Sequence, residues 1–253
     1  MIHREDHASV AVLRLDHGKV SALDVDLLSA LADQLGEIER SPSGQSVVLT
    51  GTGSTFSAGV DLVQFLDGGE AYLQDLLRAM TRTFAALFSF PRPAIAAVNG
   101  HAIAGGCVLA CACDYRIMGR GPGKIGVPEL RVGIPFPALA IEILRFAAST
   151  PHLQELVYLG KTYEVDEAYQ RGLVDEIADL ETLLDRACGV AERLGSMPPA
   201  RFQITKHQLR QPSLDRAERN AREWDAEVLR AWKDPETRAA VRAYAEATLG
   251  RRR

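Results

Sequence analysis

Short apolar runs and longer helical patterns alternate along the first part of the chain. Runs rich in β-branched residues at positions 9–15, 46–50 and 94–98 predict buried strands. After the first run, apolar residues recur at helical spacing behind Asp24, which suits the cap of that helix. A second amphipathic helix is predicted over residues 73–87. Strands that alternate with helices indicate an α/β core.

The last quarter of the chain carries no strand pattern after position 179. Helical patterns follow one another over residues 183–194, 200–209, 214–232 and 237–249. Asp234 suits the cap of the last helix, Pro235 its first turn and Gly250 its end. We therefore predict an α/β core over residues 1–195 and a helical C-terminal region over residues 196–253, packed on the core or on a neighbouring subunit.

Composition and charge narrow the class of protein. The chain has 253 residues, of which 47% are hydrophobic, enough to fill one large core. A net charge of −4 argues against a nucleic-acid partner, and the terminal run of three arginines is expected to be a solvated tail.

Residues 94–113 are the most apolar stretch, but Asn99, His101 and three glycines interrupt it, which indicates buried core rather than a membrane span. The charged start of the chain is unlike a signal peptide, so a cytoplasmic protein is expected.

The cysteines do not suggest a metal or redox site. They have neither the C-x-x-C spacing nor histidines at metal-binding distance in the sequence. Three of the four lie within the apolar stretch, as small core residues do. The four are Cys107, Cys111, Cys113 and Cys188.

Two glycine-bearing segments follow predicted strands, at residues 51–61 and 99–109. Small residues allow a ligand to approach the backbone closely. A helix that begins near Gly105 would also direct unpaired N–H groups and the positive end of its dipole at an anion. Glycines of this kind are common in ordinary turns as well, so spacing alone leaves both a binding loop and a simple turn open.

Four motifs in a fixed order carry a resemblance to a known family: S-T-F-S-A-G-V-D-L, N-G-H-A-I-A-G-G-C, C-D-Y-R-I and I-G-V-P-E-L-R-V-G-I-P. Over residues 10–177 they resemble the crotonase (enoyl-CoA hydratase/isomerase) superfamily. The resemblance implies an α/β fold, a crotonase-like spiral of ββα units, whose helical C-terminal region joins subunits into a homotrimer or homohexamer. It also implies an acyl-CoA substrate that itself supplies coenzyme A, with no separate cofactor.

The same resemblance implies binding residues. The amides of Val60 and Gly105 correspond to the family's oxyanion hole, in which two N–H groups hold the thioester oxygen. Lys206 is expected to reach the phosphates of coenzyme A, although a lysine on an amphipathic helix is often only solvated. Asp61 can instead act as a helix cap. The positions that the family uses for coenzyme A are occupied here by Lys19, Ala22, Ser57, Ala58, Asp61 and Leu62.

The acid expected to move protons is Glu129. Family hydratases place one glutamate here and a second on the helix after the second glycine segment, where this chain has Val108. The chain therefore looks like single-glutamate Δ3,Δ2-enoyl-CoA isomerases, in which one carboxylate removes a proton from C2 and returns it at C4. The apolar neighbours of Glu129 are expected to raise its pKa toward a range useful for proton transfer.

These residues favour isomerisation of 3-enoyl-CoA to trans-2-enoyl-CoA, in fatty-acid or related acyl-CoA metabolism. Hydration of trans-2-enoyl-CoA remains an alternative if another acid, from residues 67–70, replaces the missing one. A non-catalytic acyl-CoA binder or an RNA-associated relative is a third class, disfavoured by Glu129 and by the acidic charge balance. His101 and Cys107 are expected to pack rather than to react.

Overall fold

A six-stranded sheet forms the centre of the computed structural model, which describes residues 1–148 and 150–249. Strand β1 is antiparallel to β2, and the other neighbours are parallel in the order β1-β2-β3-β5-β7-β10. All three predicted strands belong to this sheet. Its strands are β1 (Ile2–His7), β2 (Val10–Leu15), β3 (Ser46–Thr50), β5 (Ala94–Val98), β7 (Tyr115–Gly119) and β10 (Glu176–Ala178).

A second, four-stranded sheet has the order β4-β6-β8-β9. Each of its first three strands directly follows a long strand of the central sheet and is in turn followed by helical structure, so the chain repeats a ββα unit three times. The strands are β4 (Thr55–Ser57), β6 (His101–Ile103), β8 (Lys124–Gly126) and β9 (Thr162–Glu164).

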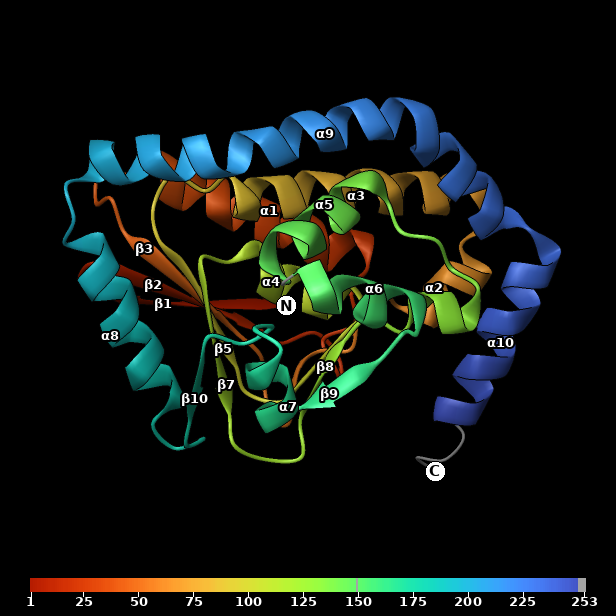
Figure 1. Ribbon diagram of the computed structural model, residues 1–253, viewed down its shortest axis with the longest axis horizontal. Coiled ribbons are helices and arrows are strands. Elements are labelled where there is room, and N and C mark those ends of the chain that lie inside the picture. Colours follow the sequence, from red (N-terminus) through yellow and green to blue (C-terminus); the bar gives the residue numbers. More distant parts are fainter. Residues whose placement is uncertain (149, 250–253) are drawn as a thin grey trace.

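The helices cover the sheets and then extend beyond them (Figure 1). Those that carry or support the site are α1 (Val25–Arg40), α2 (Leu62–Asp67), α3 (Gly69–Phe88), α4 (Gly105–Ala112), α5 (Ala138–Ala147), and the short 3-10 helix η1 (Glu129–Val132). The remainder are α6 (Thr150–Tyr158), α7 (Val165–Gln170), α8 (Leu183–Gly195), α9 (Pro199–Lys233) and α10 (Pro235–Leu249). The predicted helix cap is confirmed, since the Asp24 carboxylate accepts the Leu27 N–H at 2.7 Å.

The two faces of the central sheet are covered by different helices. Because side chains alternate along a strand, Val10 and Val12 face α8 and share a hydrophobic cluster with Leu183 and Ala187, whereas Leu13 faces the larger core. Burying each large apolar side chain contributes roughly 1.5–3 kcal/mol.

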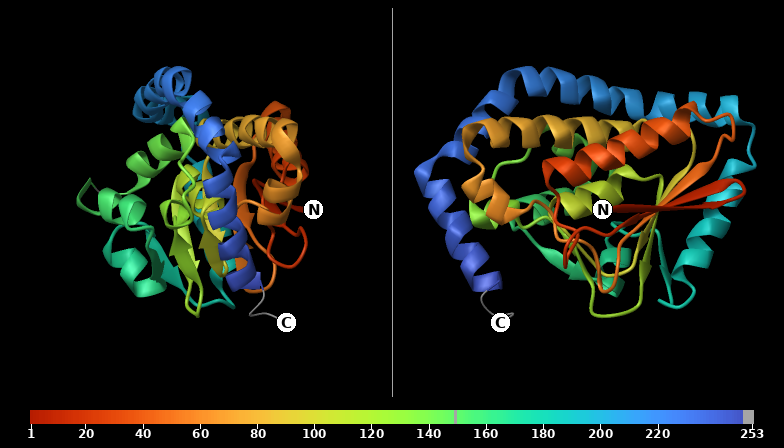
Figure 2. Two further views of the ribbon diagram at one scale, coloured as in Figure 1. Left: turned by 90° about the vertical axis from the view of Figure 1, so that its right-hand side faces the viewer. Right: turned by 180° about the vertical axis from the view of Figure 1, so that it is seen from behind.

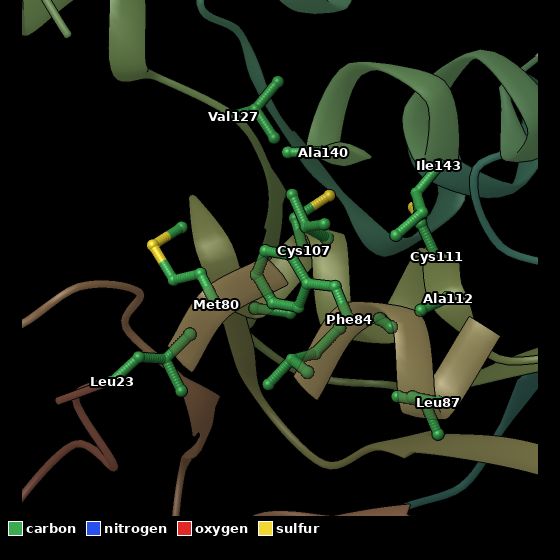
Figure 3. Close-up of a cluster of buried hydrophobic side chains, with 14 of the residues drawn as sticks. Leu23, Met80, Phe84, Leu87, Cys107, Cys111, Ala112, Val127, Ala140 and Ile143 are labelled. Atoms are coloured by element: carbon green, nitrogen blue, oxygen red, sulfur yellow. The ribbon is translucent and has the colours of Figure 1, made fainter. Parts of the chain in front are cut away.

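Helix α4 lies inside the larger core and is buried on every side. Phe84 and Leu87 of α3 and Ile143 of α5 pack around Cys107 and Cys111 of α4 (Figure 3). The prediction that the apolar stretch forms buried core is confirmed. Three of the four cysteines are buried as expected, and Cys188 is half-buried.

The tail differs from prediction in one respect. One helix was expected on each side of Pro212, but α9 runs unbroken for 35 residues through this proline. A proline inside a helix costs about 3 kcal/mol. Packing offsets this cost, because Lys206, Arg210 and Ser213 around it are buried against the core.

The helical C-terminal region packs on its own core. Helix α9 lies across α3 and α5, and α10 turns away to lie beside α2 (Figures 1 and 2). Val228 and Trp232 of α9 belong to the same hydrophobic cluster as the sheet. The predicted cap Asp234 is confirmed, since its carboxylate accepts the N–H groups of Glu236 and Thr237. The predicted stop at Gly250 and the arginine tail lie outside the described residues.

Two features are absent from the described residues. Within residues 1–148 and 150–249, no helix has the length and hydropathy needed to cross a membrane. In the same residues, no three His, Cys, Asp or Glu side chains converge as metal ligands would.

Candidate active site

The first glycine segment is fastened to the chain that precedes α1. The Ala58 N–H donates to the Val20 carbonyl at 3.0 Å, and Leu23 bonds to both neighbours of Val60, at 2.8 and 3.0 Å. Leu23 and Val60 form a parallel bridge, in which the N–H of Val60 points away from Leu23. This N–H forms no hydrogen bond within the described chain. The Val60 amide is therefore held in place and available to a ligand.

The second segment presents a helix N-terminus. Ala104 precedes α4 with φ 55°, a strained conformation for a residue with a side chain, and its own N–H is fixed to the Gly126 carbonyl at 2.8 Å. The helical ladder starts with the Val108 N–H, which donates to the Ala104 carbonyl at 3.1 Å. The Gly105 N–H thus has no partner within the helix and lies at its positive end.

The two segments touch at Gly59. Its φ is +84°, and a β-carbon built on it would lie 2.6 Å from the Ala104 side chain and 3.2 Å from the Gly105 nitrogen. Only glycine fits this contact, which brings the amides of Val60 and Gly105 to the wall of one cavity. Two converging N–H donors are the arrangement that stabilises a developing oxyanion.

Two cavities lie against this wall. The inner cavity contains Val60, Gly105 and Glu129 on its surface. The outer cavity is lined by Ala22 and Asp61 among others. The two cavities adjoin, because they share Ala58, Val60, Leu62, Ile103 and Tyr244.

Glu129 reaches the inner cavity from the first residue of η1. Its carbonyl accepts the Ile134 N–H at 3.0 Å, which fixes the backbone of the turn. One carboxylate oxygen, Oε2, is buried and has no hydrogen-bond partner among the described residues. Burial in this apolar surrounding raises the pKa of Glu129 from 4.5 to about 8.

Val108 occupies the position at which family hydratases are expected to have a second glutamate. It lies on α4 one turn after Gly105, is buried, and contributes to the lining of the inner cavity. Among the described residues that line this cavity, Glu129 is the only one with a carboxylate. The cavity therefore offers one carboxylate on a largely apolar wall, to which Tyr244 adds a hydroxyl group.

Most of the residues predicted to contact coenzyme A surround the outer cavity. Ala22, Ala58, Asp61 and Leu62 line it, and Lys19 is exposed in the segment just before it. Ser57 instead lies beneath the loop, where its hydroxyl donates to the Ser21 carbonyl at 2.8 Å and accepts the Gly59 N–H at 3.2 Å. Ser57 thus supports the loop from behind.

Asp61 is a helix cap. Its carboxylate accepts the N–H groups of Val63 and Gln64 at 2.9 and 3.0 Å, at the start of α2. This confirms one of the two roles considered for it. A contact between Asp61 and coenzyme A stays a prediction.

Lys206 requires a correction. Its ammonium group donates to the Asp114 carboxylate at 2.7 Å and to the Arg92 carbonyl at 3.2 Å, and the residue is only 7% exposed. Burial lowers its pKa to about 8, against the opposing effect of Asp114. Arg210 pairs with the same carboxylate at 2.8 Å. Lys206 lines neither cavity and fastens α9 to the core, so this burial contradicts the expected phosphate contact.

The alternative acids do not reach the inner cavity either. Glu70 forms an ion pair with Lys233 on the surface, and Asp67 is exposed at the end of α2. His101 accepts the Lys124 N–H at 3.2 Å while its ring borders the outer cavity, as expected of a packed loop histidine.

Some residues of the site were missed by sequence reasoning. Tyr244 of α10 borders both cavities, while Phe65 of α2 and Trp232 of α9 line the inner one. No local pattern identifies these positions, because they reach the cavity only after the tail folds back over the core.

Comparison with known proteins decides the family. A family model described as enoyl-CoA hydratase/isomerase matches residues 5–249. The chain belongs to this family.

The relatives of the chain include both hydratases and isomerases. It is 30% identical over 226 residues to a crotonyl-CoA hydratase from Syntrophomonas wolfei, with 84% of each chain covered. It is 28% identical over 217 residues to the mitochondrial enoyl-CoA delta isomerase 1 of Mus musculus, covering 85% of this chain and 75% of that protein. The crystal structure of human mitochondrial delta3-delta2-enoyl-CoA isomerase matches with a TM-score of 0.93 at 26% identity, over 99% of this chain and 98% of that one. The predicted crotonase fold is thereby confirmed.

Proposed function

We propose that this member of the enoyl-CoA hydratase/isomerase family converts 3-enoyl-CoA to trans-2-enoyl-CoA. The observation that carries the proposal is the pairing of Glu129 with Val108: one carboxylate, and an apolar side chain where a second acid would stand, on one cavity. Isomerisation needs one group that visits two carbons. Hydration also needs a water held by a second acid, and the described lining of this cavity contains no second carboxylate.

The two amides would hold the substrate. The thioester oxygen accepts the N–H groups of Val60 and Gly105, and the positive end of α4 adds to their effect. When a proton leaves C2, negative charge moves onto this oxygen and strengthens both hydrogen bonds. Loss of one such donor typically costs about 3 kcal/mol of transition-state stabilisation.

Glu129 would carry the proton. As a carboxylate it takes the proton from C2, and as a carboxylic acid it returns the proton to C4 while the double bond moves to C2 and C3. A pKa of about 8 keeps both forms accessible near neutral pH. The apolar wall around the group limits competition from water.

The experiment is turnover of matched substrates by the purified protein. Straight-chain 3-enoyl-CoA and trans-2-enoyl-CoA of the same length are compared by kcat/KM. We expect isomerisation to exceed hydration by about 10²-fold or more, the lower end of what a positioned acid or base contributes. Faster hydration than isomerisation would overturn the proposal.

A further inference from the structure

The part of the inner cavity beyond the shared mouth is apolar. The five residues shared with the outer cavity mark the side from which coenzyme A would enter. Phe65 and Trp232 line the inner cavity and not the outer one. Apart from Glu129, no ionisable side chain of the described chain lines this part, and a polar acyl substituent would lose its hydration there.

Two aromatic rings from separate helices close the cavity together. Phe65 of α2 and Trp232 of α9 meet edge to face, with ring centroids 5.8 Å apart and planes at 62°. They are 1% and 2% exposed. The indole Nε1 donates to the Pro135 carbonyl at 3.1 Å, so its polar atom is satisfied and its ring adds only apolar surface.

The tail helices hold this pair in place. The carboxylate of Asp225 on α9 accepts the Ala138 N–H at 2.9 Å, which fixes the segment that contains Pro135. Arg238 of α10 donates to the carbonyls of Phe65 and Leu66 at the end of α2. A wall tied to both neighbouring segments resists displacement by a ligand.

We propose that the inner cavity takes a hydrocarbon chain without polar substituents, and that the Phe65–Trp232 pair stops its far end and so sets the longest acyl chain accepted. The inference rests on the proposed function for the direction of binding, with the thioester at Val60 and Gly105. Phe65 and Trp232 are then specificity-determining residues. They act by contact with the end of the substrate and take no part in proton transfer.

Binding of saturated straight-chain acyl-CoAs, which cannot react, tests the inference apart from catalysis. Dissociation constants are measured by calorimetry for a series that lengthens by two carbons at a time. The variants are Trp232→Leu, which shortens the wall, and Trp232→Phe, which keeps a ring but removes the hydrogen bond. Trp224→Leu is the matched control, since Trp224 lies on the same helix but is 54% exposed and lines neither cavity.

The native protein should bind more tightly as the chain lengthens and then lose affinity abruptly at one length. Trp232→Leu should move this limit to longer chains and improve binding of the first excluded one by about tenfold or more, the effect of relieving a misfit of one or two methylenes. Trp232→Phe should move the limit less, and Trp224→Leu not at all.

An unchanged limit in folded Trp232→Leu protein, or equal weakening at every length, would overturn the inference. If Trp232→Leu does not fold, Phe65→Leu gives the same test from the other helix, and the same outcomes decide. Failure of the proposed isomerisation with a shifted binding limit would count against the reaction alone. A native protein that binds all lengths without a limit would count against the stop itself.

Discussion

The backbone of Gly59 lies against the first residue of α4, so that a β-carbon on Gly59 would stand 3.2 Å from the Gly105 amide nitrogen. This contact joins two segments separated by some forty positions in the sequence and sets two N–H donors on one cavity wall. The glycine is required by its φ of +84° as well as by space.

Replacing Gly59 with alanine should therefore disable the proposed oxyanion site. The added carbon would meet the Ala104 side chain at 2.6 Å and the Ile103 carbonyl at 2.7 Å, forcing the two loops apart. We expect kcat/KM to fall by about 10²–10³-fold, as for loss of one oxyanion donor. The control is Gly53→Ala, with φ +63° but open space around it, which adds backbone strain without a clash. Equal losses in the two variants would refute the contact as the cause.

The pH profile should report the buried carboxylate. Proton removal needs the ionised form of Glu129, whose pKa is raised to about 8. The value of kcat/KM, which reflects the free enzyme, should rise by about tenfold per pH unit below that pKa and level off above it. Rates of isomerisation between about pH 6 and pH 9 provide the check. A profile already flat across this range would mean that Glu129 ionises as an ordinary carboxyl group.

Adding an acid at Val108 should create hydratase activity. Val108→Glu places a second carboxyl group on the cavity that contains Glu129, where it can hold and activate water. We expect hydration of trans-2-enoyl-CoA to rise by about 10²-fold. Val108→Gln is the control, since it has a similar size but cannot exchange the proton. Burying the new group destabilises the fold, so thermal unfolding is followed in both variants. Equal hydration rates in the folded variants would contradict the prediction.

Local signals in the sequence were sufficient to predict much of the fold and part of the site. The cap at Asp24, the start of α4 at Gly105 and the buried stretch that follows depend on residues close together in the chain. Glu129 and Val108 were assigned by resemblance to a known family, and the structure brings both to one cavity. Which reaction they serve stays a proposal.

The burial of Lys206 and the place of Trp232 in the site depend on contacts between distant parts of the chain. Lys206 is bound by Asp114 across 92 positions, and Trp232 by Pro135 across 97. Neither contact leaves a periodic or compositional signal near the residue. The continuous helix through Pro212 has the same origin, because packing outweighs a local preference that sequence reasoning treated as decisive.

Self-association stays a prediction. The exposed apolar side chains of α9 indicate the surface involved. The outer surface of α9 exposes Ile204 and Leu209, at 60% and 62%. Exposed apolar side chains on one helix are typical of a surface that binds another chain. Light scattering should give a mass three or six times the 27.5 kDa of one chain. A monomer at micromolar concentration would contradict the expected trimer or hexamer.

Replacement of Glu129 with glutamine tests the central claim most directly. Glutamine keeps the shape of the side chain but cannot accept a proton. Above pH 8 the variant should be at least as stable as the native protein. The native carboxyl group is then charged in an apolar site, and its raised pKa means that native stability falls as pH rises from 4.5 toward 8. Glu70→Gln, at the surface ion pair with Lys233, controls for loss of a carboxylate elsewhere.

The measurement is kcat/KM for conversion of 3-enoyl-CoA to trans-2-enoyl-CoA. The account predicts that Glu129→Gln loses about 10²–10⁴-fold or more, while Glu70→Gln keeps the native rate. Isomerisation at the native rate by folded Glu129→Gln protein would contradict it.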